Sequence, residues 1–171
     1  MDDHKLYSIK FLWYIAKYTY YFFGEIGWFC LVIIRHFEFI MNDCVFCQIA
    51  AGKIPCFKIY EEEDFLAFLD INPWVEGHTL VIPKKHYRWV WDMPEELVGQ
   101  YFAVVNKVAN HYRQVFKTEF VMSWIYGFEV PHAHIHLFPN SRGKIAFYPK
   151  EKLPTLTAKE GEKLVAALKL K

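Results

Sequence analysis

Val130-Pro131-His132-Ala133-His134-Ile135-His136-Leu137-Phe138-Pro139 is the stretch of this sequence that decides its fold, because histidine and apolar residues alternate along it. In a β-strand this period of two places His132, His134 and His136 on one face, and apolar residues on the other. Buried imidazoles need hydrogen-bond partners, so three on one face indicate a chemical site. The alternative is a half-exposed edge strand that carries histidines without using them.

Composition limits the class of protein. The 171 residues suggest one domain of ordinary size plus an appendage, and 54% of them are hydrophobic. A net charge of +1 gives no reason to expect nucleic acid as a partner. Four cysteines, three of them close together, are too few for a secreted disulfide framework, and Cys44 and Cys47 form a Cys-x-x-Cys pair. Such a pair favours metal or redox chemistry in a reducing compartment, so we expect a cytoplasmic protein.

Residues 1–41 form a hydrophobic N-terminal extension that differs from the rest of the chain. The segment 11–34 is long enough to span a bilayer, but it contains Lys17 and Glu25. Each of these charges costs roughly 2.5–3.5 kcal/mol near the centre of a membrane helix. Three interpretations stay open: a membrane anchor or interfacial helix, which would make the protein membrane-associated; a helix that packs on the domain or a partner; and an upstream extension outside the working domain.

From residue 42 the chain reads as a compact α+β domain to residue 140, followed by a C-terminal extension, 141–171, with a short amphipathic helix. We predict an antiparallel sheet of about five strands, with helices on one side of it. Asp92 and Glu95 have the spacing of a capping box and would open a long helix to about Phe116. Thr157 and Glu160 repeat this spacing at the final helix. The expected strands besides the histidine strand are Phe57–Tyr60, Phe65–Leu69, Thr79–Pro83 and Phe120–Tyr126, and a short N-terminal helix runs from Cys44 to Gly52.

The run from His132 to Phe138 matches the histidine-triad (HIT) pattern His-φ-His-φ-His-φ-φ, where φ is apolar. The segments Cys44–Ile49, Ala67–Pro73 and Gly77–His86 and the long helix also resemble this family in order and spacing. The resemblance covers residues 42–140 and points to the zinc-containing branch of nucleotide-binding hydrolases and transferases. It implies a HIT-like fold and, as is common in that family, a homodimer.

The resemblance also implies a reaction. Family members attack the α-phosphorus of a nucleoside phosphate derivative with the middle histidine, and a covalent nucleotidyl-histidine forms. This role falls on His134, while His136 would donate to phosphate oxygens and His78 would support the pocket. Expected substrates are nucleoside phosphoramidates or dinucleoside polyphosphates. For His78, a local hydrogen bond at the start of a strand is the simpler alternative.

Nucleotide binding in the family uses a carboxylate for the ribose, which matches Asp70, and an apolar slot for the base. A lone aspartate after a strand is more often a turn residue, and any residue of the slot could be part of the core. The slot positions that match are Val45, Phe46, Ile49, Phe68 and Ile71.

Cys44 and Cys47 have the spacing that lets two thiolates share one tetrahedral zinc ion. The resemblance supplies His86 and His132 as the other two ligands. Such a closed site would be structural, since it leaves no open position for catalysis. A pair of reduced, packed cysteines and a redox pair are the alternatives.

The segment before the histidines departs from the family pattern. Many members have a glycine-rich loop with Asn and Gln there, whereas this chain has Phe128 and Glu129. Glu129 would point away, hold a leaving-group amine, or contact a cationic part of the substrate. This departure favours an alternative function, a zinc-stabilised nucleotide-binding or interaction module with weak or no catalysis. A third hypothesis is a catalytic metal held by His132, His134 and His136 together.

Overall fold

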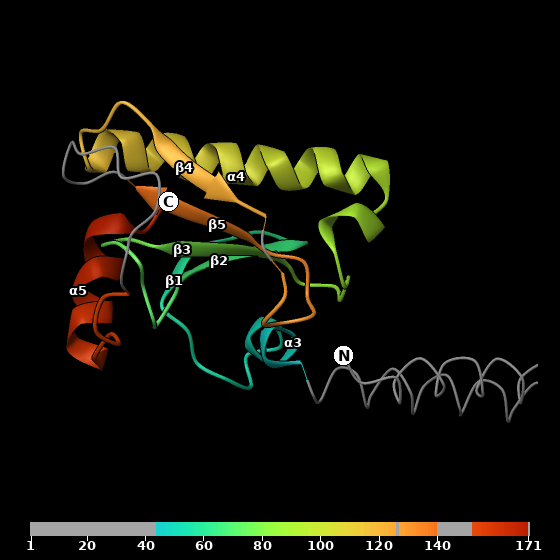
Figure 1. The fold of residues 1–171 in the computed structure, drawn as a ribbon, viewed down its shortest axis with the longest axis horizontal. Coiled ribbons are helices and arrows are strands. Elements are labelled where there is room, and N and C mark those ends of the chain that lie inside the picture. The colour runs from blue at the N-terminus through green and yellow to red at the C-terminus, as the bar shows by residue number, and fades with distance from the viewer. Residues whose placement is uncertain (1–43, 126, 140–151, 171) are drawn as a thin grey trace, which may run out of the picture. The chain divides into compact units, whose positions relative to one another are not determined.

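The structure is a computed structural model that describes residues 44–125, 127–139 and 152–170 (Figure 1). In this part of the chain a five-stranded antiparallel sheet has the strand order β1-β2-β3-β5-β4. The predicted α+β fold is confirmed. The strands are β1 (Lys58–Glu61), β2 (Phe65–Leu69), β3 (Thr79–Pro83), β4 (Val121–Trp124) and β5 (Ile135–Pro139). The helices are α3 (Val45–Ala50), α4 (Glu95–Val115) and α5 (Ala158–Leu168), with a short 3-10 helix, η1, at Val90–Asp92.

Strand β5, which contains part of the histidine run, lies inside the sheet. It pairs with β3 through His136 and Leu80, and with β4 through His136 and Trp124. The interpretation of this stretch as an edge strand is therefore wrong. Because β5 is flanked on both sides, its backbone position is fixed by two ladders of hydrogen bonds.

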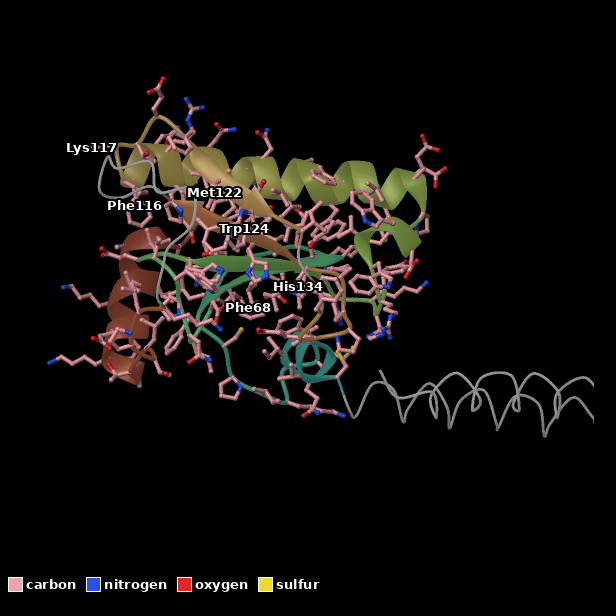
Figure 2. The ribbon with its side chains drawn as sticks, viewed as in Figure 1. Phe68, Phe116, Lys117, Met122, Trp124 and His134 are labelled. Carbon is pink, nitrogen blue, oxygen red and sulfur yellow. The ribbon has the colours of Figure 1, made fainter. Side chains whose placement is uncertain are left out.

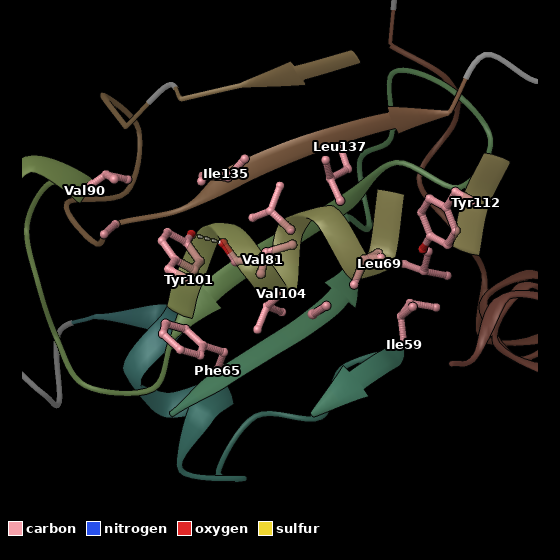
Figure 3. Close-up of a cluster of buried hydrophobic side chains, with 14 of the residues drawn as sticks. Ile59, Phe65, Leu69, Val81, Val90, Tyr101, Val104, Tyr112, Ile135 and Leu137 are labelled. Carbon is pink, nitrogen blue, oxygen red and sulfur yellow. Dashed lines mark hydrogen bonds between the residues drawn. The ribbon is translucent and has the colours of Figure 1, made fainter. Parts of the chain in front are cut away.

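The two faces of the sheet are covered by different helices. Helix α4 lies on one face, and α3 lies on the opposite side of the sheet (Figure 1). The prediction of helices on one side is wrong, because β2 is buried on both of its faces and each face needs a cover. Towards α4 the sheet presents aliphatic side chains and Phe65, which pack with Tyr101, Val104 and Tyr112 of the helix (Figure 3).

The start of α4 differs from the predicted capping box. Asp92 ends the η1 turn instead, and its carboxylate accepts a hydrogen bond of 3.1 Å from the Trp89 N–H. Pro94 is the N-cap of α4, and Met93 before it has extended backbone angles. A residue before proline is held out of the helical region, and the side chains of Val90 and Met93 are buried. The helix therefore begins after Pro94.

The short helices at both ends of the domain follow the predictions. Cys44 caps α3, because its Sγ accepts the Cys47 N–H at 3.4 Å, and Gly52 follows the helix at a φ of +72°. The Thr157–Glu160 capping box at the start of α5 is confirmed. Helix α5 adds Leu168 to the core, although the domain boundaries at residues 42 and 140 stay predictions.

No helix among the described residues is long and apolar enough to cross a membrane. The expectations for residues 1–41, including membrane contact through 11–34, lie outside the described residues.

Candidate functional site

Four side chains of the types that can bind a metal ion, from three separate parts of the sequence, meet beside α3. The ligand atoms of Cys44, Cys47, His86 and His132 all lie within 4.8 Å of one another. Cys47 Sγ is 3.1 Å from His86 Nδ1 and 3.4 Å from His132 Nδ1, and Cys44 Sγ is also 3.4 Å from His132 Nδ1. The structure thus brings together all four predicted ligands.

The surroundings of this cluster suit a metal ion. His132 Nε2–H donates to the Pro83 carbonyl at 2.8 Å, so its Nδ1 has the lone pair that faces the sulfur atoms. A hydrogen bond from the Cys47 thiol lowers the pKa of Cys44, and the pKa of Cys47 is raised because it holds the shared proton. One thiolate therefore forms readily, and a cation would stabilise the second. This donor set of two sulfurs and two nitrogens fits zinc.

Ala133, Ile135 and Leu137, which alternate with the three histidines, lie in the core, as the predicted alternation requires, but of the three histidines His136 alone belongs to a regular strand. Strand β5 begins only at Ile135, so His132 lies in the bend before it and His134 lies between that bend and the strand. The His132 N–H donates to the Val130 carbonyl across Pro131, and the Ala133 N–H donates to Tyr87. These bonds interrupt the regular strand and turn His132 towards the cysteines.

These positions also argue against one metal held by all three rings. Among the described residues, the groups close enough to share an ion combine His132 with the cysteines, and His136 with Asp70 and His78. His134 belongs to neither group.

A backbone carbonyl fixes the orientation of the His134 ring. Its Nδ1 lies 2.6 Å from the His132 carbonyl, so Nδ1–H is the donor and Nε2 has the free lone pair. The ring is only 5% exposed, and burial lowers the pKa of His134 below its ordinary value. At neutral pH it is therefore an uncharged imidazole, the form that can act as a nucleophile.

Two hydrogen bonds in series determine which ring nitrogen of neutral His136 carries the proton. The Trp74 N–H donates to His78 Nδ1 at 3.3 Å, and His78 Nε2 then donates to His136 Nδ1 at 2.9 Å. Burial, followed by the charge of His136, lowers the pKa of His78 to about 3, so this residue stays neutral. In its neutral form His136 therefore has its proton on Nε2, ready to donate.

A carboxylate oxygen of Asp70 also lies 3.4 Å from His78 Nδ1. Because a backbone N–H can only donate, the neutral His78 ring accepts from Trp74 at Nδ1 and cannot also donate to Asp70 from that nitrogen. Asp70 instead accepts a bond of 2.8 Å from the Asn72 N–H, and burial raises the pKa of its carboxyl group.

Part of the predicted base slot lies beside His134. The Phe46 ring is 5.1 Å from the His134 ring and 5.8 Å from the Phe68 ring, measured between centroids. Figure 2 shows Phe68 and His134 on the side of the sheet that faces α3. Ile71 is 53% exposed at the end of β2, and Val45 and Ile49 lie on α3. A contact of these three residues with a ligand stays a prediction.

Several aromatic residues of the site were not foreseen from the sequence. The rings of Trp74 and Trp124 are 6.0 Å apart, and Trp124 is 4.8 Å from Phe138. Lys152 Nζ lies 5.7 Å from the Trp74 ring, at the end of the described C-terminal segment. The alternation of the predicted strand could have placed Trp124 on the face of His136. No local pattern points to Trp74 or Lys152.

The fold and the site together define a histidine-triad protein, with one buried histidine held by a backbone carbonyl beside a closed Cys/His cluster. The chain belongs to the HIT domain family, whose model matches residues 51–143. At the level of the family it is a HIT-type nucleotide hydrolase or transferase.

Individual relatives support this assignment. Over 103 residues the chain is 43% identical to Protein hit of Bacillus subtilis, which covers 57% of this chain and 71% of the relative. It is 36% identical over 97 residues to the adenosine 5'-monophosphoramidase HNT1 of Saccharomyces cerevisiae, covering 56% and 61%. A zinc-bound histidine triad family protein from Mycobacterium smegmatis superposes with a TM-score of 0.61 at 35% identity, covering 75% of this chain and 94% of that one.

Proposed function

We propose that the protein hydrolyses or transfers nucleotides at the α-phosphate of nucleoside phosphoramidates or dinucleoside polyphosphates, through a covalent nucleotidyl intermediate on His134. The observation that carries this proposal is the 2.6 Å bond from His134 Nδ1 to the His132 carbonyl, which leaves Nε2 as the nucleophile. The similarity to an adenosine 5'-monophosphoramidase supports the substrate class.

The proposed reaction has two steps. The Nε2 lone pair of His134 forms a bond to the α-phosphorus, while the bond from phosphorus to the leaving nitrogen or oxygen breaks. The leaving group keeps that electron pair, and a leaving amine also takes a proton from water; the hydroxide that this leaves is neutralised by the proton released in the second step. Water then attacks the phosphorus, which releases a nucleoside monophosphate, a proton and neutral His134.

Neighbouring side chains would bind and orient the nucleotide. His136 Nε2–H would donate to a non-bridging phosphate oxygen, where a donor stabilises the charge that develops in the transition state. His78 positions His136 by donating to its Nδ1 at 2.9 Å. Phe46 and Phe68 would hold the base, with Val45, Ile49 and Ile71 at the rim of the slot, and Asp70 would accept from the ribose hydroxyls.

We further propose that Cys44, Cys47, His86 and His132 hold a structural zinc ion. Four protein ligands leave no open coordination position, so the ion would stabilise the fold without entering the reaction. It would tie α3 to the bend before β5. The zinc-bound structural relative supports this proposal.

The decisive experiment for the reaction is intact-mass spectrometry of the full chain after rapid mixing with an adenosine 5'-phosphoramidate. We expect a mass increase of one adenylyl group in wild type and none in His134→Ala. The matched control is His111→Ala, because His111 bonds the Leu168 carbonyl outside the site and should leave the adduct in place. An adduct that persists in His134→Ala, or wild type that forms none, would refute the proposal.

Metal analysis by mass spectrometry tests the zinc proposal. We expect zinc at a one-to-one ratio in wild type and its loss in Cys47→Ser. Cys56→Ser is the control, since Cys56 lies outside the cluster and should leave the zinc content unchanged. Wild type that lacks zinc after growth in zinc-replete medium would contradict the assignment.

One observation favours the alternative of a nucleotide-binding or interaction module with little catalysis. The negative charge of Glu129 acts on both His134 and Asp70, and it would repel a phosphate group. Calorimetric binding of adenosine monophosphate without any adduct on His134 would support this alternative. Homodimer formation, which the family resemblance implies, and cytoplasmic localisation stay predictions.

A further inference from the structure

The last described part of the chain passes beside the loop that joins β2 to β3. It begins with a C-terminal strap, residues 152–157, which leads into α5. We infer that Lys152, the first residue of this strap, is a nucleotide-binding residue whose ammonium group pairs with a non-bridging oxygen of the α-phosphate. This inference rests on the proposed function and adds to it a positive charge that the uncharged rings of His78 and His134 do not supply.

Three hydrogen bonds hold the strap against this loop. They run from the Leu153 N–H to the Pro73 carbonyl at 2.7 Å, from the Leu156 N–H to the Ile71 carbonyl at 2.8 Å, and from the Thr155 hydroxyl to Asn72 Oδ1 at 2.8 Å. Asp70 lies at the start of the same loop, and Trp74, whose N–H donates to His78, lies further along it. The strap therefore brings Lys152 to the loop that carries two residues of the site.

The Lys152 ammonium group lies beside one wall of the site. Its Nζ is 5.7 Å from the centroid of the Trp74 ring. That ring is 6.0 Å from the ring of Trp124, which is the β4 residue paired with His136. A cation–π contact at an exposed lysine is weak, and the four-carbon stem is flexible. The ammonium group can therefore turn from the indole to an anion bound next to it.

The charge of Lys152 already acts on two residues of the site. It lowers the pKa of His78, and this effect is larger than that of the charge on His134. It also lowers the pKa of Asp70, and there it outweighs the opposite effect of Glu129. Lys152 therefore offsets the repulsion that Glu129 would exert on a phosphate group.

The neighbouring groups indicate which part of the nucleotide Lys152 would bind. The slot proposed for the base is lined by apolar rings, and Asp70 is the acceptor proposed for the ribose hydroxyls. Neither the base nor the ribose has a negative charge, so the phosphate is the anion that a cation beside this loop would meet. A hydrogen bond from a charged donor to phosphate is shorter and stronger than one from a neutral imidazole.

Calorimetric titration of the full chain with adenosine monophosphate and with adenosine tests this inference, because the two ligands differ by the phosphate. Lys152→Gln removes the charge and keeps most of the side-chain length. We expect it to raise the Kd for adenosine monophosphate about tenfold, as loss of one hydrogen bond between charged groups would. The Kd for adenosine should stay unchanged. Lys152→Arg, which keeps the charge, should restore most of the affinity for adenosine monophosphate.

Lys159→Gln is the matched control, since it removes the same charge from an exposed position in the first turn of α5 and should change neither Kd. An unchanged Kd for adenosine monophosphate in Lys152→Gln would overturn the inference. So would an equal loss of affinity for both ligands, which a purely structural contact with Trp74 would produce.

The adduct on His134 keeps this test separate from that of the proposed function. If wild type forms the adduct while Lys152→Gln binds adenosine monophosphate normally, the inference fails and the proposed reaction stands. If wild type forms no adduct but Lys152→Gln weakens the binding of adenosine monophosphate alone, the reaction fails and the role of Lys152 stands. A wild-type chain that binds no adenosine monophosphate would refute both.

Discussion

The two faces of the central sheet are formed by the same strands but differ in composition and surroundings. On β5, Ile135 and Leu137 face α4 within a closed apolar core, whereas His136 and Phe138 face the other side, where imidazole and aromatic rings stack. Of two adjacent residues in this strand, one therefore packs in the core and the next lies in the candidate site. A shift of register by one residue would exchange the two faces, so the pairing of β5 with both neighbours protects the site as well as the fold.

Leu137→Ala should give the largest effect, because it should lower the stability of the fold and leave turnover unchanged. Leu137 is 1% exposed, and this truncation leaves a cavity under α4 that costs about 2–5 kcal/mol of unfolding free energy. Urea denaturation would measure the loss. Val115→Ala, at the partly exposed end of α4, should cost much less. Under conditions where the chain is folded, turnover per molecule should stay at the wild-type level. A large drop in turnover would mean that the core face also determines activity.

Substitution of the neighbouring residue, His136, should give the reverse outcome, a loss of turnover. His136→Ala removes the proposed donor to the phosphate and should lower kcat by roughly 10²–10³-fold, equivalent to about 2.7–4 kcal/mol. KM should change far less, which steady-state kinetics would show. His111→Ala serves again as a control for loss of an imidazole. If His136→Ala retained wild-type kcat, the histidine face would not have the assigned role.

The pH dependence of stability should report on the histidine face. Because the folded pKa of His78 is about 3 and the unfolded value is 6.5, protons bind the unfolded chain preferentially as the pH falls below 6.5. Stability from this residue is therefore complete above pH 6.5, and about 2 kcal/mol of it is lost between pH 7 and pH 5. Urea denaturation at both pH values would measure this loss. The His78→Gln variant, in which this position cannot titrate, should lose correspondingly less unfolding free energy between the two pH values. An equal loss in both proteins would rule out His78 as the cause.

The smallest effect should come from the capping box at the exposed start of α5. Thr157 accepts the Glu160 N–H at 3.3 Å, and Thr157→Ala should cost about 1 kcal/mol. Hydrogen exchange should show faster opening of α5, while the adduct on His134 forms as in wild type. Loss of the adduct would show that α5 supports the site.

Local patterns in the sequence predicted much of the architecture. β2 and β3 have the predicted bounds, because their apolar runs end at clear turn signals. The four residues of the Cys/His cluster were also predicted to lie together, although the grouping of Cys44 and Cys47 with His86 and His132 came from family resemblance. The capping box at Thr157 was found because that signal is local.

The errors arise where tertiary contacts override a local pattern. Asp92 looks like a cap, but the residue before Pro94 cannot be helical and Met93 is buried. The alternation of the histidines suggested one continuous strand, but the chain bends at His132 and the regular strand begins only at Ile135. The contact of Trp89 with Gly127 joins residues that are distant in sequence, and no spacing rule predicts it.

The meeting of Cys44 with His132 also has a consequence for how the protein is made, since these two residues are 88 positions apart. At a synthesis rate of about 5–20 residues per second, the cysteine pair is made about 4–18 s before this histidine exists. Throughout that interval the two thiols lack His132, one of the two histidines of their cluster, and β3 has no neighbour on the side where β5 will insert. The nascent chain therefore depends on a reducing environment. Closure of the sheet by β5 is a late event in its folding.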